Sequence, residues 1–140
     1  MKKKSLILLL VIILLFTIGI TSFIYSSYKV FDVKTLMVDV TVREENKTLG
    51  FNVDTDAIHF GELPRNTGGG RTIHINNTYG KEAFIVIKMR GEMSEWITIT
   101  PNNFVLEPDE RRDITFKIEI PKNASIGNHT GFVNIQFLRN

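Results

Sequence analysis

The chain has 140 residues, a formal net charge of +2 and a hydrophobic fraction of 43%, values that allow one folded domain of ordinary composition. It contains no cysteine, which excludes disulfides, thiol catalysis and thiolate metal sites. The basic excess is confined to Lys2, Lys3 and Lys4, whereas a nucleic-acid-binding protein would concentrate it on its folded domain. Nucleic acid is therefore not expected as a partner.

Residues 6–25, LILLLVIILLFTIGITSFIY, contain no charge. As a helix rising about 1.5 Å per residue, this segment would cross a hydrocarbon core about 30 Å thick. The preceding lysines favour a cytoplasmic N-terminus, and so a single-pass cell-membrane protein with an extracellular C-terminal domain. A cleaved secretory signal is the alternative, but the long apolar run and the poor cleavage site at Gly19 and Thr21 favour an uncleaved signal anchor.

From Leu36 onward, apolar and polar residues alternate as in half-buried strands, and turn-forming residues separate the runs. No amphipathic helix interrupts them, so the sequence predicts an all-β fold, an antiparallel sandwich of seven to nine strands after one N-terminal transmembrane helix. Three regions follow: the basic start and membrane helix (1–28), a juxtamembrane segment with extra strands (29–54), and the sandwich (55–140). The extra strands are expected to join a sheet edge or to form a separate hairpin. The predicted strands are 35–44, 49–54, 57–61, 71–77, 83–90, 96–101, 103–108, 113–121 and 131–139.

The order of short patterns between residues 57 and 138 is more specific than any one of them. An apolar residue before Phe-Gly is followed by a glycine-containing turn, a strand ending in Asn76, a Pro…Phe-x-Leu-x-Pro pattern, and a strand that stops at proline. This order resembles the immunoglobulin-like modules of the Hydin-type and major-sperm-protein-like class. The resemblance implies a binding or structural unit without catalytic activity. Its signature residues here are Phe60, Gly61, Gly69, Trp96, Pro101, Pro108, Pro121 and Gly131.

Five aromatic residues on different strands are expected to face the core. They are Phe60, Trp96, Phe104, Phe116 and Phe132.

The run Gly68–Gly70 could cradle a phosphate, mark a processing site or form a turn. A phosphate loop needs Gly-Lys-Ser/Thr before a helix, whereas Arg71 and Thr72 begin a predicted strand. The neighbouring LPRNTG has one residue too many for a sortase signal. The turn residues on both sides favour a flexible hairpin loop.

No catalytic, metal or cofactor site is predicted. His59, His74 and His129 lack ligand spacing and are expected to be half-exposed strand residues. Asp54 and Asp56 lack the glycine-spaced oxygen ligands of a calcium loop. The serines at 26, 27, 94 and 125 lack the context of a catalytic nucleophile, and a small-molecule ligand is not expected.

Four Asn-X-Ser/Thr sequons are more than chance predicts for this composition. Each lies in or beside a predicted turn on the extracellular side, so N-glycosylation is expected. Four sequons without cysteine favour a prokaryotic, archaeal source. The acceptors are Asn46, Asn76, Asn123 and Asn128.

The leading hypothesis is a non-enzymatic, membrane-anchored immunoglobulin-like domain that acts as a structural or protein-interaction module with other envelope proteins. One alternative is a pilin- or archaellin-like filament subunit, although Ser5 occupies the position where a glycine or alanine is usual before the cut. Another is an accessory subunit of a membrane complex, with Thr17, Gly19, Thr21 and Ser22 as a small-residue helix face.

Overall fold

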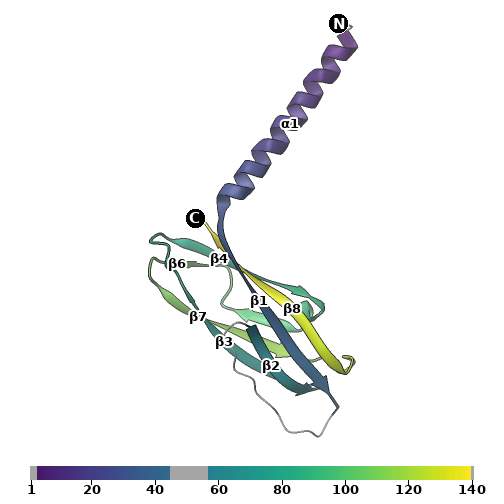
Figure 1. Cartoon of the computed structure of the whole chain (residues 1–140), viewed down its shortest axis with the longest axis vertical. Helices are drawn as coiled ribbons and strands as arrows, with labels where there is room; N and C mark the ends of the chain where they lie inside the picture. The colour runs from purple at the N-terminus through teal and green to yellow at the C-terminus, as the bar shows by residue number, and fades with distance from the viewer. Residues whose placement is uncertain (1–2, 45–56, 140) are drawn as a thin grey trace.

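A computed structural model describes residues 3–44 and 57–139 and shows a long helix projecting from a β-sandwich (Figure 1). Helix α1 spans Lys3–Lys29, and strand β1, Val30–Arg43, starts at the next residue. The predicted helix and eight of the nine predicted strand regions are thus confirmed; region 49–54 lies outside the described residues. The remaining elements are β2 (Ala57–Pro64), β3 (Gly68–Asn76), β4 (Ala83–Gly91), the short 3-10 helix η1 (Glu92–Glu95), β5 (Ile97–Thr100), β6 (Phe104–Leu106), β7 (Arg111–Glu119) and β8 (Gly127–Leu138).

The strands form two sheets, which confirms the immunoglobulin-like sandwich. The five-stranded sheet has the order β2-β1-β8-β4-β6, and the three-stranded sheet has the order β3-β7-β5. Pairing is antiparallel except between β1 and β2, which run parallel at one sheet edge. Phe60 and Gly61 lie opposite Val40 alone in this pair, because the register shifts there. The φ of 76° at Gly61 suits glycine and allows this bulge.

Strand β1 is an interior strand, not the edge strand or separate hairpin expected for its region. It lies between β2 and β8 and pairs with β8 from Val30 opposite Leu138 to Val42 opposite Gly127. Its side chains Val38, Val40 and Val42 are buried between the sheets. Alternation indicates which face of a strand is buried but not which strands are its neighbours. The division of the chain at residues 28 and 54 stays a prediction of domain organisation.

The core fills the space between the two sheets, and Phe116 and Phe137 are its largest fully buried side chains. Of the five aromatic residues expected there, Phe60 and Phe116 are buried, and Trp96 and Phe104 pack at its border. The prediction for Phe132 is wrong: its side chain is 51% exposed. On β8, the residues at 129, 131, 133, 135 and 137 face inward, so the period of two turns Phe132 outward.

The glycine run is part of strand β3, so the prediction of a flexible hairpin loop is also wrong. Gly68 and Gly70 pair with Glu119 and Lys117 of β7. Strands β2 and β3 belong to different sheets, so the turn between them crosses from one sheet to the other. A Cβ atom at Gly68 would lie 2.6 Å from the carbonyl oxygen of Ile118. Glycine therefore permits a close approach of two strands rather than a loose turn.

Candidate functional site: the helix junction and the outer sheet face

The apolar side chains of α1 are exposed along its length. Its stretch Lys3–Tyr25 is long and apolar enough to cross a membrane, and none of that stretch is buried against the rest of the protein. Thr17 donates its hydroxyl to the carbonyl oxygens of Ile13 and Leu14, and Thr21 donates to that of Thr17. The two threonine hydroxyls of the predicted small-residue face are thus bonded within the helix.

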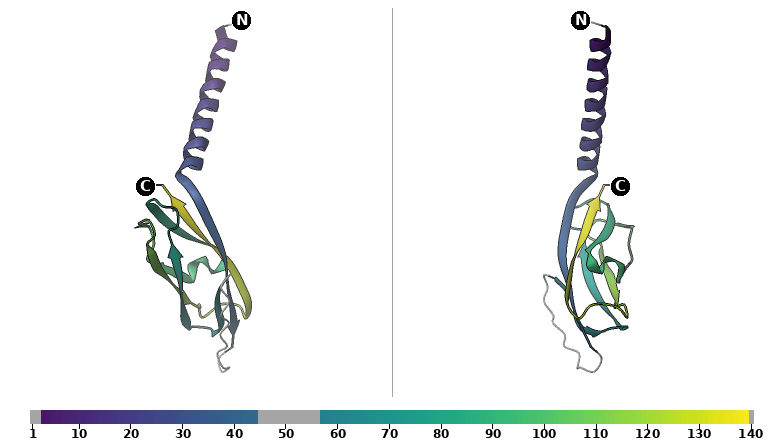
Figure 2. Two further views of the ribbon diagram at one scale, coloured as in Figure 1. Left: turned by 60° about the vertical axis from the view of Figure 1, so that its left-hand side comes forward. Right: turned by 90° about the vertical axis from the view of Figure 1, so that its right-hand side faces the viewer.

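The end of α1 is held against the last strand of the sandwich (Figure 2). The backbone nitrogen of Arg139 donates to the carbonyl oxygen of Lys29 at 2.8 Å. The guanidinium carbon of Arg139 lies 3.8 Å from the ring centroid of Tyr28, within the range of a cation–π contact. Since Val30 also pairs with Leu138, the helix is joined to both β1 and β8 without a linker.

Three aromatic rings lie together beside this junction. Phe31 lies 5.1 Å from Tyr79 and 6.3 Å from Phe137, between ring centroids, and Tyr79 lies 5.3 Å from Phe137. The Tyr79 hydroxyl donates to the carboxylate of Asp32. That hydrogen bond, with smaller contributions from burial and from the Asp32 charge, raises the pKa of Tyr79 to about 12. The tyrosine therefore stays neutral and fixes the loop after β3 to β1.

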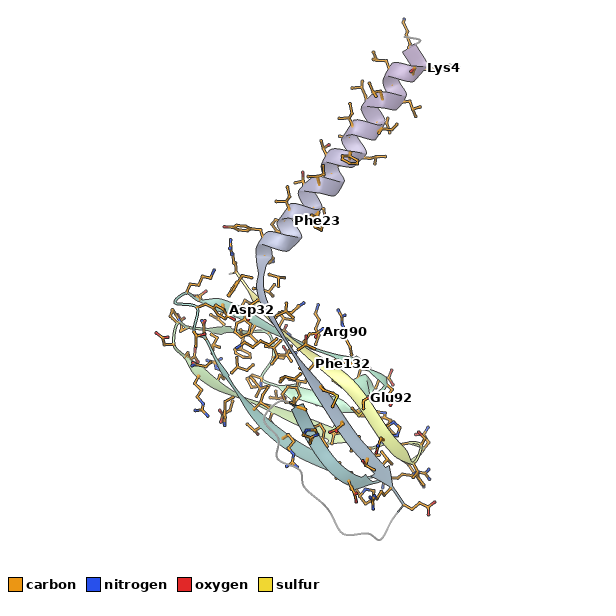
Figure 3. All side chains as sticks on the ribbon, viewed as in Figure 1. Lys4, Phe23, Asp32, Arg90, Glu92 and Phe132 are labelled. Carbon is orange, nitrogen blue, oxygen red and sulfur yellow. The ribbon has the colours of Figure 1, made fainter. Side chains whose placement is uncertain are left out.

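The outer face of the five-stranded sheet carries an apolar patch of Val33, Met37 and Phe132. Met37 and Phe132 lie directly opposite each other on β1 and β8, with exposed fractions of 41% and 51%. Arg90 of β4 lies opposite Phe132 on its other side, and Figure 3 shows these two side chains together. The alternation of polar and apolar residues in β1 and β8 is regular enough to predict which residues face outward. It does not predict which strands lie side by side on that face.

Threonine and asparagine pairs border this patch on the same face. Thr35 donates to Asn134 at 2.9 Å, and Thr41 donates to Asn128 at 2.8 Å. Cross-strand pairs of this kind hold β1 and β8 in register.

Asn77 is a buried polar residue that sequence reasoning missed. Its side-chain nitrogen lies 2.7 Å from the carbonyl oxygen of Lys81, 2.9 Å from that of Leu106 and 3.0 Å from that of Glu107. Its side-chain oxygen accepts from the backbone nitrogen of Tyr79. Because an asparagine in a turn is common, nothing in the sequence sets Asn77 apart from the exposed Asn76 before it.

The three histidines lie apart, and each contacts a carboxylate of its own. His59 contacts Asp39 at 2.7 Å, and His74 contacts Asp113. Within residues 3–44 and 57–139, no three His, Cys, Asp or Glu side chains gather as a metal site would require. Asp54 and Asp56 lie outside these described residues.

His129 is 5% exposed, so it is buried rather than half-exposed as predicted. Its Nδ1 lies 3.1 Å from a carboxylate oxygen of Glu92, and its Nε2 lies 2.8 Å from the carbonyl oxygen of Ser125. The Ser125 hydroxyl is farther from Nε2, at 3.4 Å. A Ser-His-acid triad needs the Nε2 lone pair to face the hydroxyl. Here Nε2 faces the carbonyl oxygen of Ser125, which is closer than the hydroxyl, so these three side chains do not form a triad. Instead, His129 links η1 to the β7–β8 connection.

Three predicted glycan acceptors lie on exposed positions. Asn76 ends β3, Asn123 lies in the β7–β8 connection, and Asn128 is near the start of β8. Asn123 and Asn128 lie at the end of the sandwich away from the helix, because β8 runs back toward Val30. Asn128 also accepts the hydrogen bond from Thr41, and Asn46 lies outside the described residues.

The signature residues occupy strand ends and strand contacts. Pro101 follows β5, Pro108 lies in the turn after β6, and Pro121 lies between β7 and β8. Gly131 of β8 faces β4, where an added Cβ would lie 2.8 Å from the carbonyl oxygen of Arg90. An added Cβ at Gly69 would make ordinary contact with Leu63, at 3.5 Å.

An open groove lies on the outer side of the three-stranded sheet, where Gly68 contributes no side chain. Trp96 of this groove has its ring centroid 4.9 Å from that of His129. The residues that line the groove include Asn66, Gly68, Trp96, Lys117 and Glu119.

Neither a protein-family model nor a curated protein sequence matches the chain. Among solved structures, the DraE adhesin in complex with chloramphenicol succinate is 11% identical, with a TM-score of 0.44, and the match covers 78% of this chain and 96% of that one. The AfaE-3 adhesin from Escherichia coli is 14% identical, with a TM-score of 0.43 and the same coverage. The fold assignment rests on the strand pairing described above.

Proposed function

We propose that the protein is a non-enzymatic, single-pass envelope protein that presents its sandwich outside the cell for contact with other proteins. In this topology α1 crosses the membrane and its basic start lies in the cytoplasm. The observation that carries the proposal is the uncovered apolar surface of α1, which continues into an interior strand of the sandwich. In water that surface would be exposed, whereas the acyl chains of a bilayer would cover it.

The outer patch of Val33, Met37 and Phe132 supports a protein partner. Aromatic residues, methionine and arginine are enriched in protein interfaces, and here Phe132 and Met37 lie beside Arg90. The contact would form on a preorganised sheet, since the Thr35–Asn134 and Thr41–Asn128 pairs hold the two central strands together.

The exposed sequon positions support a glycosylated surface protein, and the absence of cysteine supports a prokaryotic, archaeal source. Within this proposal the sandwich is a Hydin-type module. The signature positions that support this assignment are Gly61 at its bulge and Gly131 at its close strand contact.

Membrane retention of α1 is tested by alkaline extraction of cell membranes. The native chain is expected to stay in the pellet, whereas a variant with Leu10→Arg and Leu14→Arg should be released, because arginine is costly in the bilayer centre. The matched variant with Leu10→Ala and Leu14→Ala should be retained. Release of the native chain would contradict a membrane-spanning helix.

A filament subunit is a second candidate, and the rigid junction favours it. A subunit whose helix packs in a filament core needs a fixed angle between helix and head, which the Arg139–Lys29 hydrogen bond supports. The mass of the mature N-terminus distinguishes the two candidates. Removal of the residues through Ser5 would support the filament, removal near Thr21 would indicate secretion, and an intact start would support the anchor.

A further inference from the structure

We propose that a collar of basic and aromatic residues at the helix end of the sandwich binds the phosphate headgroups of anionic phospholipids. The inference rests on the proposed function, because it requires α1 to cross the membrane. The collar holds the sandwich against the membrane surface instead of leaving it free to tilt. Its members are the cations Lys29, Lys34, Lys81 and Arg139 and the aromatic residues Tyr25, Tyr28, Phe31 and Tyr79.

Three segments that are distant in sequence bring these cations to one end of the molecule. Lys29 ends α1, Lys34 belongs to β1, Lys81 lies between β3 and β4, and Arg139 follows β8. The junction fixes the position of these cations along the axis of α1. The Arg139–Lys29 hydrogen bond lies only a few residues beyond Tyr25, where the apolar stretch ends. A bilayer around α1 would therefore have its headgroups at the level of the collar.

Each collar cation lies over an aromatic ring. The nitrogen of Lys81 is 4.2 Å from the ring centroid of Phe31, and that of Lys34 is 5.3 Å from that of Phe137. The nitrogen of Lys29 is 6.0 Å from the ring of Tyr25. By contrast, Arg43 and Lys117 elsewhere on the sandwich pair with carboxylates.

The lysines of the collar are also open to solvent, with Lys29, Lys34 and Lys81 all exposed. A cation over a ring keeps its full charge, so it can still attract an anion.

Two acidic groups at the same end, Asp32 and Glu110, are engaged within the protein. Asp32 accepts the hydrogen bond from Tyr79, and Glu110 bonds Arg112 and the backbone nitrogen of Glu107. Glu107 and Asp109 lie on the β6–β7 turn next to Asn77.

Basic residues next to a membrane span are drawn to anionic lipids, and tyrosine rings favour the headgroup level. Charge and ring chemistry therefore point to the same lipid surface.

The absence of native cysteine allows single-site labelling of the full-length protein. An environment-sensitive fluorophore is attached at Thr78→Cys in the collar loop, at Lys122→Cys at the far end, or at Leu14→Cys in α1. The labelled proteins are reconstituted in vesicles of phosphatidylcholine alone or with phosphatidylglycerol, and quenching by the neutral, water-soluble acrylamide is measured.

Phosphatidylglycerol is expected to reduce quenching at Thr78 several-fold at low salt, and high salt should restore it. Quenching at Lys122 should stay unchanged. In the Thr78→Cys protein, Lys34→Gln with Lys81→Gln should abolish the lipid effect, whereas the matched pair Lys88→Gln and Lys122→Gln should preserve it.

The label positions separate the two proposals. Strong quenching at Leu14 would contradict the membrane-spanning helix itself. Protection at Leu14 together with equal quenching of Thr78 in both lipids would overturn the collar alone. An equal loss of the lipid effect in both lysine pairs would also overturn it, since net charge and not collar position would then be responsible.

Discussion

The backbone nitrogen of Arg139 donates a hydrogen bond to the carbonyl oxygen of Lys29, joining the residue after the last strand to the last residue of the helix. The final carbonyl groups of a helix have no partner within it, so this bond satisfies one of them. The orientation of the sandwich is thereby coupled to that of α1.

Loss of this bond should loosen the junction. Arg139→Pro removes the donating N–H, whereas Arg139→Ala keeps it and removes only the contact with Tyr28. Spin labels in α1 and at the far end of the sandwich should show a broader distance distribution for Arg139→Pro than for Arg139→Ala. Equal widths would mean that the hydrogen bond does not orient the sandwich.

Asn77→Ala should lower the free energy of unfolding by about 1–3 kcal/mol, because carbonyl oxygens of Lys81, Leu106 and Glu107 lose their shared donor. Chemical denaturation followed by the fluorescence of Trp96, the single tryptophan, measures this change. The exposed neighbour is the control: Asn76→Ala should change stability by less than about 0.5 kcal/mol. Similar losses in both variants would contradict a supporting role specific to Asn77.

Two glycine substitutions should have opposite effects. At Gly131, a Cβ would meet the Cε atom of Met89 and the backbone of Arg90, so Gly131→Ala should cost about 1–3 kcal/mol. At Gly70, the nearest atom would be the carbonyl oxygen of Phe116 at 3.9 Å, so Gly70→Ala should be neutral or stabilise by up to about 1 kcal/mol. The same denaturation experiment compares them. If Gly70→Ala lowered the free energy of unfolding, the glycine run would have a role other than permitting close strand packing.

Tyr79 should titrate well above the ordinary value of 10.0, near a pKa of about 12. A raised tyrosine pKa stabilises the fold while the hydroxyl is protonated, in full below pH 10, and this contribution is lost as the pH rises toward 12. Ultraviolet absorbance of tyrosinate, compared between the native chain and Tyr79→Phe, isolates this group. Asp32→Asn should return the titration toward 10.0; an unchanged titration would exclude the Asp32 hydrogen bond as the cause.

Replacing the exposed apolar patch should weaken partner binding without unfolding the sandwich. Met37→Ser with Phe132→Ser removes two half-exposed side chains and is expected to abolish co-purification of the partner in mild detergent. Ile126→Ser, an equally exposed apolar position in the β7–β8 connection, is the control and should retain it. Retained co-purification in the double variant would place the contact elsewhere.

Local pattern was enough to predict the helix and the sandwich. The uncharged residues 6–25 leave few alternatives to a helix, and the valines at 38, 40 and 42 show the period of a half-buried strand. Aromatic character alone places Phe132 in the core, whereas the period of two on β8 turns it outward and buries Phe137.

The junction and the collar depend on contacts that a local pattern does not contain. Arg139 and Lys29 are neighbours because β1 and β8 pair along their lengths, and that pairing is nonlocal. Lys81 lies over Phe31 of β1, and Tyr79 of the same loop bonds Asp32 of the same strand. The burial of Asn77 is nonlocal for the same reason, since its acceptors Leu106 and Glu107 lie at the end of β6 and just after it.

The central claim, that α1 crosses the membrane and presents the sandwich outside, is tested most directly by labelling intact cells with a membrane-impermeant maleimide. Because the native chain has no cysteine, each variant carries one reporter. Lys122→Cys at the far end of the sandwich should be labelled on intact cells, and Lys4→Cys only after the membrane is opened. Labelling of Lys4→Cys on intact cells, with Lys122→Cys protected until the membrane is opened, would contradict the account.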